Sequence, residues 1–257
     1  MADTNSNNLV FSPNIRAYLL LTGTTWCWGA NAILGKIAVG EISPMLLVTL
    51  RWLGVVLLLL LFARKYLIQD WPILRHHVRY ICLMGTLGFT AFNALFYVAA
   101  HSTSAINIGI LQGSIPVFVL LGTFLLYHSR ITRIQILGVA ITLVGVGIVA
   151  SGGDISQLAG LSTNQGDIYT LIACLLYAGY SVGLSRRPAV SALGLFTSMA
   201  MVAFIVSLPL LAIEIGSGKF LAPTVTGWVV VVLVSLFPSL IAQVFFCLLY
   251  TSPSPRD

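Results

Sequence analysis

Long apolar runs constrain this chain more than any other feature of its sequence. The mean hydropathy is +0.98, and 8% of the residues are charged, against roughly 25% in soluble domains. So many apolar residues cannot all be buried in the core of a soluble domain. We therefore predict an all-α membrane protein and exclude a soluble enzyme, a nucleic-acid module and a disordered scaffold. Runs of about 18 or more mostly apolar residues are long enough to cross a bilayer as helices. Eight such runs occur, at about 17–39, 45–63, 80–101, 104–127, 134–151, 168–184, 191–213 and 227–250.

Basic residues gather on one side of the predicted topology. Cytoplasmic loops carry the excess of Lys and Arg in multispanning proteins. We therefore expect the N-terminal tail, residues 1–16, to be cytoplasmic, and we attribute the net charge of +6 to topology rather than to nucleic-acid binding. The opposite side holds Lys219 and, near the end of the first run, Lys36. The basic residues on the cytoplasmic side are Arg16, Arg64, Lys65, Arg75, Arg79, Arg130, Arg133, Arg186 and Arg187.

No motif in the sequence predicts a metal or a cofactor. Cys27, Cys82, Cys174 and Cys247 each lie singly inside an apolar run, without a CxxC pair or a Cys/His cluster. Residues 145–150 satisfy a GxGxxA pattern, but a dinucleotide site would need a strand, a turn and a soluble βαβ unit. We interpret this pattern as close helix packing.

Two stretches of the sequence repeat at a nearly constant offset. A shift of 150 residues places Ala91–Phe96 on Ile241–Phe246, and a shift of 149 places Trp28–Asn31 on Tyr177–Tyr180. A constant offset across two runs predicts two five-helix repeats. Because five is odd, the second repeat enters the membrane from the opposite side. Many secondary transporters follow this inverted plan, with the substrate site near the midplane between the repeats.

The second predicted repeat is shorter than the first. The first covers 17–151 with five spans, and the second covers 166–249 with three, so ten spans are expected and about eight are present. Residues 250–257 are abruptly polar and have no counterpart in the first repeat. We expect a truncated reading frame that ends in a non-native tail. The alternative is a genuine eight-span protein with a short disordered tail.

Several motifs resemble EamA-type transporters of the drug/metabolite transporter superfamily. Trp26–Asn31 followed by Thr49–Trp52 resembles the start of the first repeat of that family. Phe96–Ala105 resembles the passage from its third to its fourth span, and Gln112–Phe118 resembles its proline-bearing fourth span. The resemblance implies ten spans, location in the bacterial inner membrane and export of amino acids or other small metabolites. The chain departs from the family at His128–Arg130, where a glutamate is usual, and in the last two spans.

Arg51 is the leading candidate for substrate binding. It lies about seven residues into the second run, or roughly 10 Å at the rise of an α-helix. Polar groups inside a span are costly and are therefore functional candidates. A guanidinium group holds a carboxylate or phosphate by two parallel hydrogen bonds. The alternative is an arginine that snorkels to the outer interface or binds the carbonyl groups of a neighbouring helix.

Other polar residues inside the runs extend this predicted site. Asn93, Tyr97 and His101 are spaced four residues apart and form one stripe, on which His101 is a candidate proton site. The alternative is interhelical hydrogen bonding for Asn93 and Tyr97 and an interfacial position for His101. The remaining candidates are Asn31, Gln112, Tyr177, Ser181 and Gln243 for substrate binding, and Trp28, Pro116 and Pro238 for lining or gating the cavity.

No Asp or Glu falls well inside any of the eight runs. Exporters of cationic drugs usually need a buried carboxylate, so the sequence favours neutral, zwitterionic or anionic substrates. We expect a secondary transporter that exports small metabolites, such as amino acids or related carboxylates, by alternating access between the repeats. Its expected partners are a small-molecule substrate and the lipid bilayer, with a second copy of the chain as a further candidate.

Two other functional classes remain open. One is a non-transporting or inactive truncated membrane protein. The other is a membrane-embedded enzyme, which would need clustered His, Asp or Glu residues at a membrane face, and the sequence offers no such cluster.

Overall fold

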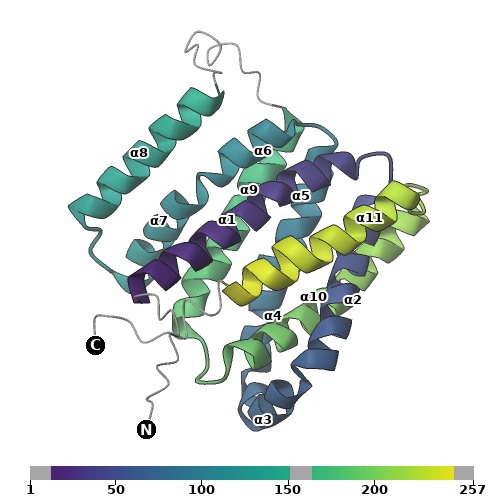
Figure 1. Ribbon diagram of the computed structural model, residues 1–257, viewed down its shortest axis with the longest axis horizontal. Coiled ribbons are helices and arrows are strands. Elements are labelled where there is room, and N and C mark those ends of the chain that lie inside the picture. The colour runs from purple at the N-terminus through teal and green to yellow at the C-terminus, as the bar shows by residue number, and fades with distance from the viewer. Residues whose placement is uncertain (1–12, 151–163, 246–257) are drawn as a thin grey trace, which may run out of the picture.

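The computed structural model describes residues 13–150 and 164–245. Within these two ranges every regular element is a helix, which confirms the predicted all-α class. The predicted tail at 250–257 lies outside the described residues, as does most of the tail at 1–16. The α-helices, shown in Figure 1, are α1 (Pro13–Ile37), α2 (Pro44–Phe62), α3 (Arg64–Leu74), α4 (Val78–Gly85), α5 (Phe92–Ala100), α6 (Ala105–Gln112), α7 (Ile115–Tyr127), α8 (Arg133–Ala150), α9 (Gln165–Gly183), α10 (Ala192–Gly216) and α11 (Val225–Val234).

As far as the structure describes them, the apolar runs predicted from the sequence correspond to helical segments. Two of these segments are less apolar or shorter than the rest. Threonine and asparagine residues interrupt the apolar character of α1, and the apolar part of α8, Arg133–Gly145, is short. The lengths of the others fit a multi-pass membrane protein. Six segments are long and apolar enough to cross a membrane, namely Pro44–Phe62, Arg64–Ala100, Ala105–Tyr127, Gln165–Arg186, Ala192–Gly216 and Val225–Phe245.

Two of the membrane-crossing helices contain a π-helical segment. The first, η2 (Thr86–Ala91), lies between α4 and α5, and the second, η5 (Ser235–Ile241), follows α11. The two segments begin 149 residues apart, which is the offset that relates the predicted repeats. Single π turns inside α-helices frequently mark functional sites. The two-repeat organisation stays a prediction, and this spacing supports it.

The first π segment packs tightly against α9 and α2. A Cβ atom at Gly88 would fall 2.3 Å from Cγ of Tyr180, so only glycine fits this approach. Trp52 stacks on Phe89 with ring centroids 4.6 Å apart, and Phe89 meets Phe196 edge-on at 5.8 Å. Aromatic pairs in these geometries stabilise beyond their buried area. The contacts between these rings join α2, η2, α9 and α10.

The membrane-crossing segment Ala105–Tyr127 is broken near its middle. α6 ends at Gln112 and α7 begins at Ile115, with Pro116 in its first turn. Proline is favourable in a first turn, where backbone N–H groups have no intrahelical partner. α8 contacts α6 and stands at one edge of the bundle (Figure 1).

Acidic side chains bind the N-termini of helices rather than entering the centre of the bundle. Glu214 of α10 accepts hydrogen bonds from the backbone N–H groups of Met45 and Leu46 at 3.0 and 3.2 Å, at the start of α2. Asp167 forms a capping box with Asn164 at the start of α9. Carboxylates are favourable at these positions because the helix dipole presents partial positive charge there. These two acids therefore act as ties between helices or at helix ends.

Candidate functional site

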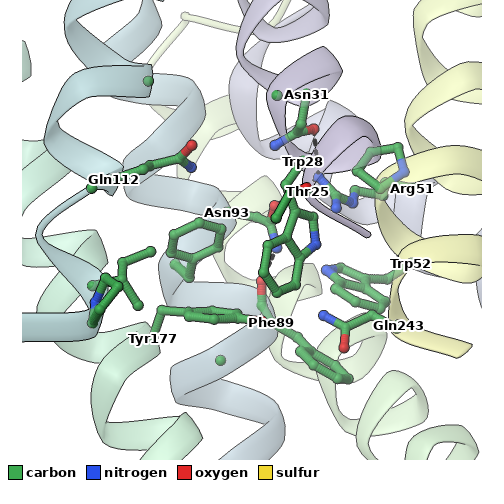
Figure 2. Close-up of a pocket in the computed structure, with 18 residues that line it drawn as sticks. Thr25, Trp28, Asn31, Arg51, Trp52, Phe89, Asn93, Gln112, Tyr177 and Gln243 are labelled. Carbon is green, nitrogen blue, oxygen red and sulfur yellow. Dashed lines mark hydrogen bonds between the residues drawn. The ribbon is translucent and has the colours of Figure 1, made fainter. Parts of the chain in front are cut away.

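A cavity of about 360 Å³ lies between helices from both halves of the chain. Pockets for small ligands measure roughly 300–1,000 Å³, so the cavity suits a small molecule. Aromatic rings form much of its wall, and polar groups enter it at a few points (Figure 2). The residues that line it are Thr25, Trp28, Gly29, Asn31, Arg51, Trp52, Gly88, Phe89, Phe92, Asn93, Gly109, Gln112, Gly113, Ile115, Pro116, Tyr177, Pro238 and Gln243.

Most of the site residues predicted from the sequence come together on this cavity. They belong to α1, α2, α5, α6, α7, α9, η5 and the helical residues that directly follow η5. Their roles in binding or gating stay predictions. The predicted residues that line the cavity are Trp28, Asn31, Arg51, Asn93, Gln112, Pro116, Tyr177, Pro238 and Gln243.

Tyr97 and Ser181 lie elsewhere. Tyr97 is buried against Arg51, in the layer behind the cavity wall. The hydroxyl of Ser181 donates to the carbonyl of Tyr177 one turn earlier in α9, at 2.9 Å. Serine residues inside helices often make this bond to their own helix. Neither side chain is among those that line the cavity.

His101 directly follows the membrane-crossing segment Arg64–Ala100, one residue beyond α5. The Lys36 ammonium group donates to the carbonyls of Ala100 and Thr103 at 2.9 and 3.1 Å, and so it caps this helix end. Partial desolvation by the surrounding protein, followed by the Lys36 charge, lowers the pKa of His101, and Glu214 acts in the opposite direction. His101 does not line the cavity, and its role as a proton site stays a prediction.

Arg51 is the centre of a buried hydrogen-bond network. Its side chain is 4% exposed. Nε donates to Oγ of Ser239 at 2.5 Å. Nη1 donates to Oδ1 of Asn93 at 2.7 Å, to Oη of Tyr97 at 2.6 Å and to Oδ1 of Asn31 at 3.2 Å. The guanidinium group therefore joins α1, α2, α5 and η5 at one point.

The acceptors of this network are themselves held in place. Nδ2 of Asn93 donates to the carbonyl of Phe89 in the first π segment at 2.6 Å. The Ser239 hydroxyl donates to the carbonyl of Val234 at 2.5 Å, at the second π segment. Both π segments thus orient an oxygen toward Arg51. Such support fixes the direction in which the guanidinium group faces the cavity.

The charge on Arg51 has no counter-charge in the described part of the chain. All four hydrogen-bond partners are neutral, and no carboxylate among the described residues forms an ion pair with it. Nη2 makes no hydrogen bond to any described residue. A buried cation without a partner is costly, and its cost falls when an anion pairs with it. The geometry therefore offers a cation with free hydrogen-bonding capacity on the wall of a small cavity.

Trp52, Phe89, Phe92 and Thr25 line the cavity but were not among the predicted site residues. An aromatic residue in an apolar run more often packs against helices or lipid, so the sequence pattern did not separate these rings from the others. Two features of the sequence could have indicated Trp52, namely its position directly after Arg51 and the polar N–H group of its ring. Nε1 of Trp52 is buried and has no hydrogen-bond partner within residues 13–150 and 164–245.

The cavity has the character of a binding site. It combines one cation, several amide and hydroxyl groups and aromatic walls. Across residues 13–150 and 164–245, no three His, Cys, Asp or Glu side chains gather in a way that would hold a metal ion. None of the residues on the cavity wall is a His, Cys, Asp or Glu.

The family model for EamA-like transporters matches residues 15–151 of this chain. The chain belongs to the EamA-like transporter family. The match covers the helices that contribute Arg51, Asn31 and Asn93 to the cavity. The family is thus the one indicated by the motifs at Trp26–Asn31 and Thr49–Trp52.

Curated relatives with transporter names cover more of the chain. The uncharacterized transporter YyaM of Bacillus subtilis is 30% identical over 177 residues, which are 68% of this chain and 57% of YyaM. YetK of the same bacterium is 25% identical over 88% of this chain and 69% of its own length. The uncharacterized inner membrane transporter YedA of Escherichia coli is 27% identical, over 89% of this chain and 72% of YedA. The alignment with YyaM therefore spans less than two thirds of that protein.

A solved crystal structure shares the fold. It superimposes with a TM-score of 0.67 at 18% identity and covers 90% of this chain and 77% of its own. At this identity the likeness concerns the fold alone. The shared fold covers 90% of this chain, whereas the family model matches residues 15–151.

Proposed function

We propose that this EamA-like protein is a secondary transporter for small metabolites that carry a carboxylate, such as amino acids or related acids. The observation that carries the proposal is Arg51, a buried cation without a counter-charge among the described residues, on the wall of a cavity of about 360 Å³. A substrate carboxylate would supply the missing charge through Nη2. Transporter names among the relatives support the class of activity.

Alternating access between two inverted repeats is the proposed mechanism. The cavity takes residues from both halves of the chain, including Asn93 after the first π segment and Gln243 after the second. Substrate sites between inverted repeats, near interrupted helices, are typical of secondary transporters. Arg51 touches both halves, since it donates to Asn93 and to Ser239. Movement of one half against the other would therefore change the surroundings of the guanidinium group.

We propose a location in the bacterial inner membrane with a cytoplasmic N-terminus. Arg64, Lys65 and Arg79 follow α2 and lie in the first part of the segment Arg64–Ala100, and all are exposed. The positive-inside rule places this end of the segment in the cytoplasm. The name of YedA as an inner membrane transporter agrees with this location. Association of two copies of the chain stays a further prediction.

The test is efflux of preloaded labelled amino acids from cells that express the chain. We expect efflux that depends on the chain and falls about tenfold or more in Arg51→Gln, because a hydrogen bond to a charged group contributes roughly 1.5–3 kcal/mol. Arg79→Gln is the matched control, since Arg79 is exposed on α4. Membrane expression of each variant is measured alongside.

Two results would contradict the proposal. One is efflux that is the same with and without the chain at equal expression. The other is efflux that Arg51→Gln and Arg79→Gln reduce equally. The first result would favour a non-transporting membrane protein.

A further inference from the structure

Two buried polar atoms near Arg51 have no hydrogen-bond partner among the described residues. Nε1 of Trp52 is a donor, and Oε1 of Gln243 is an acceptor. The side chains are 1% and 5% exposed, and both line the cavity. A buried donor or acceptor that stays unpaired is costly, and such groups in native proteins call for an explanation. A ligand that carries the complementary groups would satisfy both atoms.

The ring of Trp52 lies beside the charge of Arg51. Cζ of Arg51 is 5.6 Å from the centroid of the Trp52 ring. Stacking on Phe89, with the two planes only 10° apart, fixes the direction of the indole N–H group. A carboxylate that pairs with Arg51 would lie beside the Trp52 ring, and its second oxygen would be the acceptor that Nε1 of Trp52 lacks. The pair provides two donors of fixed direction, and one of them is charged.

The amide oxygen of Gln243 can be compared with that of Asn93 in the first half of the chain. At an offset of 150 residues Gln243 corresponds to Asn93, and each follows its π segment by two residues. Oδ1 of Asn93 accepts from the Arg51 guanidinium group. In the second half, the position that corresponds to Arg51 is Met201 at an offset of 150 residues, or Ala200 at an offset of 149. Neither residue carries a charge. The amide oxygen of Gln243 therefore lacks the cation that its counterpart has.

We infer that the cavity selects carboxylates that also carry an ammonium or hydroxyl group. The carboxylate binds to Arg51 and Trp52, and the second group donates to Oε1 of Gln243. Arg51, Trp52 and Gln243 all line the one cavity of about 360 Å³, which a single small ligand can fill. Trp52 and Gln243 are thus specificity-determining residues. The inference rests on the proposed function, because it requires the carboxylate at Arg51.

The test is calorimetric titration of the purified chain in lipid nanodiscs with four matched probes. They are leucine, 2-hydroxy-4-methylpentanoate, 4-methylpentanoate and 3-methylbutylamine. We expect leucine and the hydroxy acid to bind about tenfold more tightly than 4-methylpentanoate, because only they donate to Gln243. We expect the amine to bind most weakly, because it lacks the carboxylate.

Two variants separate the two contacts. Gln243→Met should bring the three carboxylates to about equal affinity, because it removes the acceptor at similar side-chain volume. Trp52→Phe keeps a ring on Phe89 but removes the N–H group, and it should weaken all three carboxylates by a common factor of about five. Gln69→Met and Trp228→Phe are the matched controls, since both residues are exposed, and neither should change any affinity.

The outcomes distinguish this inference from the proposed function. If the three carboxylates bind with equal affinity to the unchanged chain, and Arg51→Gln weakens all of them, the inference is wrong and the proposed function stands. If no carboxylate binds in a way that depends on Arg51, both are wrong. A preference for leucine that survives Gln243→Met would also overturn the role of Gln243.

Discussion

Replacement of Asn93 by leucine tests whether the buried charge of Arg51 depends on its neutral partners. The substitution removes a hydrogen bond of 2.7 Å from the guanidinium group and another of 2.6 Å to the carbonyl of Phe89. A bond to a charged group contributes roughly 1.5–3 kcal/mol and a neutral one about 1 kcal/mol, so we expect a loss of about 3 kcal/mol. At roughly 2–4 °C for each kcal/mol in a chain of this size, Tm should fall by about 6–12 °C.

The assay is thermal unfolding of the purified chain in detergent, followed by intrinsic tryptophan fluorescence. The same substitution is then made in an Arg51→Met background. Without the buried charge, Asn93→Leu loses only the neutral bond, so its cost should fall to about 1 kcal/mol. Gln69→Leu is the control at an exposed amide and should change stability by less than about 0.5 kcal/mol. An equal cost of Asn93→Leu in both backgrounds would refute the reasoning, because Asn93 would then act independently of the charge.

Two further predictions concern packing and pH. Gly88→Ala should cost about 1–3 kcal/mol, because the new methyl group would collide with the ring of Tyr180. Gly179→Ala meets open space and should not destabilise, so similar Tm losses in the two variants would contradict this account. The lowered pKa of His101 means that the unfolded chain binds its proton more readily, so this group lowers stability as the pH falls through its ordinary pKa of about 6.5. His101→Gln should therefore lose less Tm than the unchanged chain between pH 7 and pH 5, and an equal loss would show that His101 contributes nothing.

The sequence predicts the positions of the helices well because hydrophobicity determines which segments cross the membrane. Each apolar run is a helical segment, since a chain in lipid must satisfy its backbone hydrogen bonds within the segment. The π segments were not predicted. Nothing in Thr86–Ala91 or Ser235–Ile241 except Pro238 departs from an ordinary apolar helix. Their position depends on the helices that pack against them, such as the ring of Tyr180 against Gly88.

The candidate site could be predicted only in part for a similar reason. Polar residues in an apolar run stand out, and most of those predicted line one cavity. The stripe of Asn93, Tyr97 and His101 shows the limit of this reasoning. Eight residues of helix extend about 12 Å, so Asn93 reaches the cavity while His101 lies at the end of the helix. Helical spacing gives the face of a residue but not its depth relative to a cavity that several helices form.

The unpaired charge of Arg51 gives a physical reason for coupling between binding and reorientation on the proposed function. A cation inside the bilayer is costly when water is excluded, and the described partners of Arg51 are all neutral. Closure of an empty cavity would isolate this charge from water, whereas closure around a carboxylate would isolate a neutral pair. The loaded protein should therefore close more readily than the empty one. An Arg51→Met variant removes this difference, so its cavity should close equally well with and without substrate even though it binds substrate poorly.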